Sequence, residues 1–316
     1  LEFRRVLFRS PLLFTTYILP IGDIIRKHSL EFHLFADDTQ LYISFKSSGL
    51  ACHISQLENC LQELRAWMTS NFLMLNEAKT EFLLIGSKQQ LGKLDCPSTC
   101  LHIGGAEILP SESARNLGVI MDSTMSMDAH IASVSRACFY NIFNISRVRH
   151  YLDSQTCKML MHCLVTTRLD YCNSLYANLP SKSIQKLQRI QNSAARCISR
   201  SSRYDHISPV LQSLHWLPVS SRITFKLLVL THDCLHNENS PSYLKELISP
   251  YTPQRTLRSC SDSLLTQPKS KTSMGDRAFS ASAPHLWNEL PLSIRNVSSK
   301  DHFKTLLKTQ IGRAHV

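Results

Sequence analysis

The chain has 316 residues, of which 43% are hydrophobic and only 9 are glycine, with 35 Lys and Arg against 24 Asp and Glu. This length and hydrophobic content suit a globular protein with two or more domains. The scarcity of glycine, with no G-x-G-x-x-G or G-x-x-x-x-G-K-[ST] pattern, argues against a glycine-rich nucleotide-binding loop. No apolar run approaches the roughly 20 residues that a membrane-spanning helix needs.

The net charge of +11 is unevenly distributed along the chain. Residues 1–150 hold 14 basic and 14 acidic residues, whereas residues 151–316 hold 21 basic and 10 acidic residues. A basic half beside a neutral half predicts a polyanionic partner, and nucleic acid is the first candidate. The alternative is a basic surface that is merely hydrated.

Eleven cysteines are spread over the chain. No C-x-x-C pair occurs, and the nearest pair, Cys96 and Cys100, does not have the spacing of a zinc knuckle. Several others lie within apolar helical patterns: Cys138, Cys157, Cys163, Cys197 and Cys234. This use of cysteine predicts reduced, buried thiols in an intracellular protein.

Both ends of the chain have unusual sequences. The first ten residues, LEFRRVLFRS, and the last six, IGRAHV, look like translated sequencing-adaptor strings. The Arg-rich start could be mistaken for a targeting segment. We therefore expect residues 1–10 and 311–316 to be artefacts and the chain to be a fragment.

Residues 31–45 predict a β-hairpin. A first strand, EFHLF, is followed by TQLYISF, in which apolar and polar residues alternate with a period of two. Ala36, Asp37 and Asp38 fall at the connection. Adjacent aspartates repel each other and are poor strand formers. Either a turn, where carboxylates accept from nearby backbone N–H groups, or a metal ion accounts for them.

Periodicity predicts the elements that follow the hairpin. Residues 51–70 form an amphipathic pattern with apolar residues every three or four positions. The apolar stripe consists of Ile54, Leu57, Leu61, Leu64 and Met68. Further candidates are strands at 80–86 and 116–122 and a hairpin over 101–109 that turns at Gly104-Gly105.

After residue 127 the pattern is helical almost throughout. Helices are predicted near 127–150, 153–170, 181–200, 205–215 and 219–236, with a last one over 300–311. Residues 249–285 are rich in Ser, Thr and Pro, which predicts a loose connection. Trp67, Trp216 and Trp287 each stand among apolar residues, so we interpret them as core anchors rather than platforms for base stacking.

The helix predicted over 181–200 has an apolar and a basic side. Ser181, which follows Pro180, is expected to cap its N-terminus. Five basic residues lie largely off the apolar stripe: Lys182, Lys186, Arg189, Arg196 and Arg200. We predict that these five residues contact nucleic-acid phosphates.

Several stretches resemble one family in order along the chain. FHLFADDTQLYISF (32–45) resembles the catalytic hairpin of reverse transcriptases from LINE-type (non-LTR) retrotransposons, and PLLFTTYILPIGDIIRKH (11–28) resembles the segment before it. WMTSNFLMLNEAKTEFLLIG (67–86) resembles the next motif, with its N-x-x-K-T-E pattern, and NLGVIMDSTMSMDAHI (116–131) resembles the region near the primer grip. RLDYCNSLYANLP, LHWLPVSSRITFKLLVL and APHLWNELPLSIR extend the resemblance to roughly 11–310.

This resemblance implies an α+β fold and RNA-directed DNA polymerase (nucleotidyltransferase) chemistry. Residues 11–126 would form a partial polymerase palm with a short antiparallel sheet and helices. Residues 127–248 would form an all-α thumb and a basic C-terminal region, and residues 249–310 a loose connection with terminal helices. The implied partners are template RNA and primer or target DNA, together with dNTPs in the intact parent protein. A membrane is not an implied partner. The implied location is the nucleus, with a cytoplasmic ribonucleoprotein stage.

The resemblance also assigns roles to individual residues. Asp37 and Asp38 match the paired catalytic aspartates that ligate Mg²⁺, or Mn²⁺ in its place, and Asp37 would be the firmer ligand. Ala36 would leave room for the primer end. Lys79 would lie near the nucleotide phosphates as a proton donor, and its alternative is a solvated turn lysine. Gly118 would let the backbone approach the primer in the primer-grip region, and its alternative is an ordinary glycine at a strand edge.

Parts of the family pattern are missing. The resemblance places the third catalytic aspartate before residue 11, and we expect neither this motif nor an endonuclease domain within the given sequence. We therefore expect that this chain does not polymerise alone. An alternative is a non-catalytic basic helical module, over residues 127–310, that binds RNA or DNA through phosphates. A third is a genomic relic without function. The oligomeric state is left open by the sequence.

Overall fold

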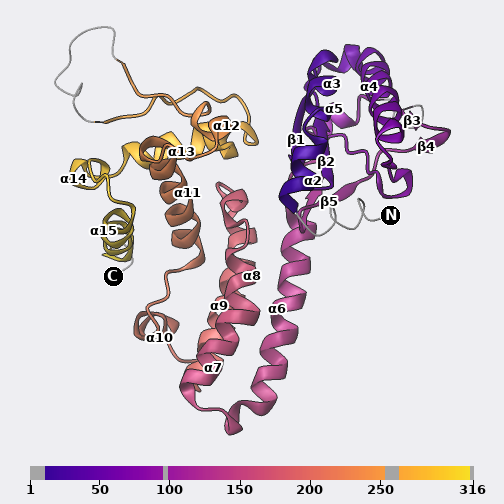
Figure 1. Cartoon of the computed structure of the whole chain (residues 1–316). Coiled ribbons are helices and arrows are strands. Elements are labelled where there is room, and N and C mark those ends of the chain that lie inside the picture. The colour runs from indigo at the N-terminus through magenta and orange to yellow at the C-terminus, as the bar shows by residue number, and fades with distance from the viewer. Residues whose placement is uncertain (1–10, 95–98, 253–262, 314–316) are drawn as a thin grey trace. The chain divides into compact units, whose positions relative to one another are not determined.

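The computed structural model describes residues 11–94, 99–252 and 263–313. The chain divides into two compact units, Leu1–Met125 and Ser126–Val316. Figure 1 shows that the N-terminal unit combines helices with short strands, whereas the labelled elements of the C-terminal unit are helices. The predicted α+β fold class is confirmed. Across the described ranges no helix has both the length and the apolar character that crossing a bilayer requires.

The N-terminal unit contains short helices and two-stranded antiparallel hairpins. Its helices are α2 (Pro11–Ile18), α3 (Ile21–Lys27), α4 (Leu50–Ser70) and α5 (Lys88–Leu91), with 3₁₀ turns at Ser47–Gly49 and Glu77–Lys79. Its strands pair as β1 (Glu31–Phe35) with β2 (Asp38–Tyr42), β3 (Leu101–Ile103) with β4 (Ala106–Ile108), and β5 (Ser113–Asn116) with β6 (Val119–Asp122). The helix predicted over 51–70 is thus confirmed, as are the hairpins predicted over 31–45 and 101–109.

One apolar core lies under these elements. Ile21 and Ile25 of α3, Leu61 and Leu64 of α4, and Ile103 of β3 are all buried in it. Burial of each such side chain contributes about 1.5–3 kcal/mol. One face of the β1–β2 hairpin packs against the same core. The hairpin is therefore held by contacts with segments distant in sequence rather than by its own hydrogen bonds alone.

Two predicted strands differ from the structure. Residues 80–86 form only a single bridge, between Phe82 and Pro110, because no continuous partner strand lies beside them. The strand predicted over 116–122 begins at Val119, because Leu117 and Gly118 have positive φ angles of 44° and 82° and turn the chain. Asn116 instead ends β5. β2 also stops at Tyr42, before the predicted end at residue 45.

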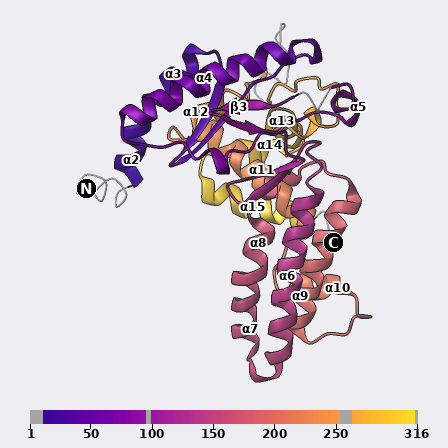
Figure 2. The same ribbon diagram turned by 90° about the vertical axis from the view of Figure 1, so that its right-hand side faces the viewer.

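The C-terminal unit is a set of packed helices. They are α6 (Asp128–Val148), α7 (Ser154–Met161), a π-helical segment His162–Thr166, α8 (Thr167–Asp170), α9 (Ser181–Ser199), α10 (Ile207–Ser213), α11 (Val219–His236), α12 (Ser242–Lys245), α13 (Phe279–Asn288), α14 (Leu292–Arg295) and α15 (Lys300–Arg313), with 3₁₀ turns at Arg149–Tyr151, Asn173–Tyr176 and Gly275–Arg277. Figure 2 shows α6 and α9 running side by side. The helices predicted between residues 127 and 236 and over 300–311 are confirmed.

The core of this unit includes a stacked aromatic pair. Trp287 and Phe303 are fully buried, with ring centroids 5.8 Å apart, and Leu228 and Leu307 pack with them. The interpretation of Trp287 as a core anchor is confirmed. Trp67 is partly buried against the core of the N-terminal unit. Trp216 is partly buried as well, but it lines a pocket.

Two predictions at helix ends were wrong. Pro180, not Ser181, is the N-cap residue of α9, and no side chain caps that end. The fixed φ of proline suits the extended backbone that precedes a helix. The loose connection predicted over 249–285 includes the start of α13, which begins at Phe279 because Ala283 and Trp287 bury one side of it. Part of that connection, residues 253–262, lies outside the described residues.

The cysteines of the helical unit are buried to different degrees. Cys138, Cys157 and Cys234 are buried, and burial raises the pKa of the Cys138 thiol to about 11. Cys197 is partly buried, and burial followed by the neighbouring Cys157 raises its pKa to about 11. Cys163 is exposed on the π-helical segment, which corrects the prediction of a buried thiol there.

Arg149 ties α6 to the end of α9. Its side chain is buried, and the guanidinium donates to the carbonyls of Cys197, Ile198 and Leu152 at 2.7–2.8 Å. The last carbonyls of an α-helix have no partner within the helix. A planar group with five donors can satisfy several of them at once. Arg149 thus closes the C-terminus of α9 while anchoring the end of α6.

Replacing Arg149 with Ala is expected to lower the free energy of unfolding by about 2–4 kcal/mol, because three carbonyls at least partly buried lose charged donors. Arg149→Lys should recover only part of this loss, since an ammonium cannot span the three acceptors. Urea unfolding followed by circular dichroism measures both. The exposed Arg147, in the last turn of α6, is the matched control, and Arg147→Ala should change stability by less than about 0.5 kcal/mol. Equal effects at the two positions would contradict the role of Arg149.

His232 is a buried histidine on α11. It is 1% exposed, its ring stacks on Phe303 at 4.3 Å, and its Nε2 lies 2.7 Å from the carbonyl of Val297. Burial lowers the pKa of His232 below its ordinary value, and the nearby His236 also lowers it, although the Val297 carbonyl acts in the opposite direction. The folded state therefore holds His232 neutral where the unfolded chain would bind a proton.

Stability should consequently be greatest above about pH 6.5 and should decrease as the pH falls below that value, because only the unfolded state is protonated there. The measurement is the melting temperature between pH 8 and pH 5.5. His232→Gln retains an N–H donor but cannot titrate, so its melting temperature should depend less on pH than that of the wild type. The matched control is His162→Gln at an exposed position. A pH dependence unchanged in His232→Gln would disprove the assignment.

Candidate active site and nucleic-acid interface

The aspartate pair lies at the tip of the β1–β2 hairpin. Phe35 pairs with Asp38 across the strands, so Ala36 and Asp37 form the two-residue turn. Ala36 has a φ of 53°, a left-handed conformation that this tight connection requires. Asp37 is therefore in the turn, whereas Asp38 is the first residue of β2, and both are exposed.

The alternation of side chains determines which groups share a face with Asp38. Leu41 pairs with Phe32, and both pack against the core. Because successive strand residues point to opposite faces, Asp38, Gln40 and Tyr42 share the other face. There Tyr42 stacks on His33, with ring centroids 5.4 Å apart. Partial burial raises the pKa of Tyr42, and the charge of Glu31 raises it further.

One contact connects this face to the turn that contains Gly118. The amide of Gln40 donates to the side-chain oxygen of Asn116, the last residue of β5. Leu117 and Gly118 follow directly and form the β5–β6 turn, where glycine accommodates the φ of 82°. Asp38 is two residues from Gln40, so the structure brings the Gly118 turn alongside the aspartate hairpin. The sequence shows no sign of the contact between Gln40 and Asn116.

Lys79 ends a short 3₁₀ helix that is well anchored. Glu77 in that helix pairs with Arg65 of α4 at 3.3 Å. Two residues beyond Lys79, the carboxylate of Glu81 accepts from the backbone N–H of Arg115 in β5 at 3.0 Å. The Lys79 segment therefore lies next to the same β5 strand that meets Gln40. Lys79 itself is exposed, and within the described ranges no hydrogen bond or ion pair joins it to Asp37 or Asp38.

At the tip of the β1–β2 hairpin the protein offers a metal ion only a small number of ligands. Among the described residues no group of three or more His, Cys, Asp or Glu side chains could hold a metal. Asp37 and Asp38 are exposed and have no hydrogen-bond or ion-pair partner in those ranges, so their oxygens are available. Mg²⁺ is commonly held by one or two carboxylates together with phosphates and water. The pair thus fits a cation shared with a nucleotide rather than one held by protein alone.

The predicted phosphate-binding residues lie along one side of α9. At about 100° per residue, Lys182, Lys186, Arg189 and Arg196 fall within about 80° of one another around the helix. Lys182 and Arg189 are exposed and have no partner in the described part of the chain, and Lys186 lies 3.6 Å from Asp128. We call Lys182, Lys186 and Arg189 the α9 basic row.

The other two predicted residues already have protein partners. Arg196 is partly buried and donates to the carbonyls of Ser202 and Asp205 at 3.1 and 3.2 Å. Arg200 ends α9 with a φ of 56° and donates to the carbonyl of Arg149 at 3.3 Å. The two guanidinium groups still add positive charge near the α9 basic row. Some of their N–H donors, however, bond backbone carbonyls and are not available to a phosphate.

A second exposed surface lies on α6, and none of its residues was predicted from the sequence. We call it the α6 aromatic row; its members are Arg136, Phe139, Tyr140, Phe143 and Arg147. The three aromatic side chains are 43%, 67% and 60% exposed, although the opposite side of α6 is buried against neighbouring helices. Arg147 lies 6.0 Å from the Phe143 ring. Aromatic rings beside arginines can stack on unpaired bases. The i, i+3, i+4, i+7, i+11 spacing was a usable signal, but aromatic residues in a helix first suggest a core.

The two units differ strongly in charge. Residues 1–125 contain 11 basic and 13 acidic residues, whereas residues 126–316 contain 24 basic and 11 acidic residues. The α9 basic row and the α6 aromatic row both lie in the second unit. The first unit, which contains the aspartate hairpin, has almost no net charge. Attraction of a polyanion is therefore concentrated on the helical unit.

Comparison with known proteins gives one match. Residues 7–121 match the family model described as "Reverse transcriptase (RNA-dependent DNA polymerase)". The match includes both aspartates, Lys79 and Gly118, and it ends within β6. The N-terminal part of the chain, which contains the aspartate hairpin, is therefore similar to reverse transcriptases. No curated protein and no solved structure matches the chain.

Proposed function

We propose that the chain is part of the RNA-directed DNA polymerase of a LINE-type retrotransposon and that Asp37 and Asp38 are its metal-binding catalytic pair. The observation that carries the proposal is the exposed aspartate pair at a hairpin tip, within the segment that matches the reverse transcriptase family and beside the Gly118 turn. A carboxylate pair on a turn between two paired strands is held in a defined position while remaining accessible.

The residues of the chain would divide the work of nucleotidyl transfer. A bound Mg²⁺, or Mn²⁺, would supply the charge that neutralises phosphate and makes a 3′-hydroxyl more acidic. Asp37 and Asp38 would hold that cation from the hairpin, and the small side chain of Ala36 would leave space for a primer end. Lys79 would bind nucleotide phosphates and deliver a proton to the leaving group. Gly118 would allow close approach of the primer backbone.

We also propose that the chain does not polymerise by itself. Two carboxylates with no third acidic ligand among the described residues bind a divalent cation weakly. Catalysis by two metal ions needs both ions to be held in register with the substrate. In an intact parent enzyme the partners would be template RNA, primer or target DNA and dNTPs. Such an enzyme would act in the nucleus after a cytoplasmic ribonucleoprotein stage.

A second candidate function is binding without chemistry. The charge excess of residues 126–316, the α9 basic row and the α6 aromatic row favour a surface that holds RNA or DNA. This surface lies outside the segment that matches the family model. The binding activity therefore does not depend on an active polymerase site, and the two functions can be tested separately.

The metal assignment predicts the effect of changing both aspartates. In the wild-type chain, Mn²⁺ should broaden the NMR signals of residues 36–40, and Asp37→Asn with Asp38→Asn should weaken this effect at least about tenfold, because neutral amides are poor ligands for hard cations. Asp23→Asn, at an exposed aspartate on α3, is the control and should change nothing. Unchanged broadening in the double variant would exclude the pair as the metal site.

Primer extension with Mg²⁺ or Mn²⁺ tests whether the chain polymerises alone. Robust dNTP incorporation by the purified chain would refute the proposal that it is inactive by itself.

The binding assignment predicts a change in salt dependence. The variant Lys182→Gln, Lys186→Gln, Arg189→Gln should bind RNA more weakly and reduce the slope of log affinity against log salt by about one for each phosphate that it no longer neutralises. The charge-matched control replaces Arg203, Lys269 and Lys271 with Gln, all exposed in the same unit. Fluorescence anisotropy over a series of salt concentrations measures both variants. If the two reduce the slope equally, attraction is a property of overall charge and the α9 basic row has no specific role.

A further inference from the structure

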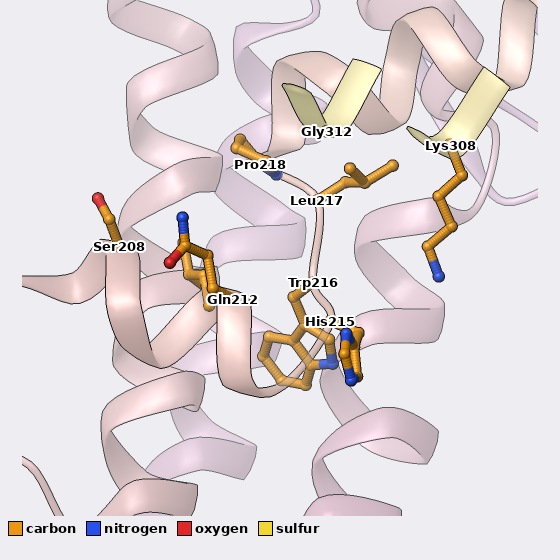
Figure 3. Close-up of a pocket in the computed structure, with 9 residues that line it drawn as sticks. Ser208, Gln212, His215, Trp216, Leu217, Pro218, Lys308 and Gly312 are labelled. Atoms are coloured by element: carbon orange, nitrogen blue, oxygen red, sulfur yellow. The ribbon is translucent and has the colours of Figure 1, made fainter. Parts of the chain in front are cut away.

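The C-terminal unit contains a pocket that none of the assigned functions uses. Figure 3 shows it between α10, the loop after α10, and α15. Its volume is about 230 Å³, and its lining includes Ser208, Gln212, His215, Trp216 and Lys308. In Figure 3 the indole of Trp216 lies at one end, with Gln212 and Lys308 on either side. A cavity of this size suits a single planar group rather than a large ligand.

The end of α10 orients Trp216. His215 adopts a left-handed conformation with a φ of 54°, and its N–H donates to the carbonyl of Gln212 at 2.9 Å. The N–H of Trp216 donates back to the carbonyl of Leu211 at 2.8 Å. These paired bonds form the Schellman arrangement that ends many helices. The backbone of Trp216 is therefore fixed directly beneath the last turn of α10.

Two glutamines of α9 hold the other side of the loop. Gln191, which is 2% exposed, donates to the carbonyl of Leu217 at 2.8 Å. Gln188 accepts from the N–H of Val219, at the start of α11, at 2.8 Å and also donates to Gln191. Gln191 is buried and Gln188 is partly buried, and their hydrogen bonds restrict the backbone of the loop. The loop that forms one wall of the pocket is thus held in place by α9.

The lining combines an aromatic surface with unused polar groups. Trp216 is partly buried, with Leu211, Leu217 and Pro218 beside it. The side chains of Ser208, Gln212, His215 and Lys308 have no hydrogen-bond or ion-pair partner within the described ranges, so their donors and acceptors are available to a ligand. None of the lining residues is acidic. A favoured ligand therefore has a flat apolar face, a polar edge and a negative charge.

We propose that this pocket binds one unpaired base of a single-stranded nucleic acid. The base would stack on Trp216, its polar edge would meet the amide of Gln212, and its phosphate would lie near Lys308. An apolar peptide side chain could also pack on Trp216, but it would form no hydrogen bond with Lys308 or with the amide of Gln212. The inference rests on the proposed binding of nucleic acid by this unit, whose net charge is strongly positive.

The test compares two strands with the whole chain. One is a fluorescent oligouridine RNA of about 15 nucleotides, a length within the range that single-strand binding sites occupy. The other has the same length and backbone but no bases. Trp216→Leu should weaken binding of the oligouridine at least about fivefold, as expected for the loss of one stacked base. It should leave the abasic strand and the salt slope unchanged. Trp216→Phe keeps a stacking ring and should lose less affinity than Trp216→Leu.

A second measurement uses the wild-type chain, so that its result does not depend on whether Trp216→Leu folds. Oligouridine containing 5-iodouridine, photo-cross-linked to the wild-type chain and digested, should yield the adduct within residues 208–218. Lys308→Gln, on the surface of α15, should lower the cross-linking yield and reduce the salt slope by about one.

The outcomes separate this inference from the proposed binding function. Equal affinities of wild type and Trp216→Leu for oligouridine, or an equal loss for the two strands, would overturn the base pocket while leaving the α9 basic row intact. A cross-link confined to other segments would do the same. Failure of the wild-type chain to bind either strand would overturn both the pocket and the nucleic-acid function of the unit. Competition by an apolar peptide without any cross-link would assign the pocket to protein instead.

Discussion

The register of one short hairpin is the constraint on which the candidate active site depends. Phe32 and Leu41 pair across β1 and β2 and are held against the core by α3 and α4. Because side chains alternate along a strand, burying Leu41 forces Asp38 to the solvent side and leaves Asp37 in the turn. A slip of one residue would turn Asp38 toward the core, where an unpaired carboxylate is costly. The accessible acidic pair is therefore a consequence of apolar packing.

The two units differ in charge, and the proposed catalytic and binding roles fall on different units. The first unit, which is almost neutral, contains the segment that matches the reverse transcriptase family model, with its aspartate hairpin. The second unit has a large excess of Lys and Arg, and its helices α6 and α9 expose rows of aromatic and basic side chains. A strongly positive surface at an acidic metal site would compete with the cation, whereas a positive surface elsewhere can concentrate a polyanion. The charge distribution is consistent with both proposed roles.

Helix α9 connects several features of the second unit. Its exposed side contains the α9 basic row, its C-terminal carbonyls accept from Arg149, and its buried Gln191 holds the loop of the Trp216 pocket. One helix thus positions both the α9 basic row and one wall of the Trp216 pocket. The side chain of Gln191 is buried and hydrogen-bonded, while Lys182 and Arg189 are exposed. This division between buried polar contacts and exposed charge makes the helix both rigid and available to a ligand.

Local pattern was sufficient for much of this protein. Alternation placed the hairpin around Asp37 and Asp38, and helical periodicity placed α4, α6 and α9, because both signals reside in neighbouring residues. Tertiary structure decided the rest. The contact of Gln40 with Asn116 joins residues distant in sequence, residues 80–86 found no continuous partner strand, and the rings of α6 are exposed because neighbouring helices cover only its other side. The Trp216 pocket likewise needs α10 and α15 to meet. The sequence by itself determined most of the helices and the acidic hairpin tip, whereas only packing decided which of their faces stay open, since exposure depends on the neighbours that a segment acquires on folding.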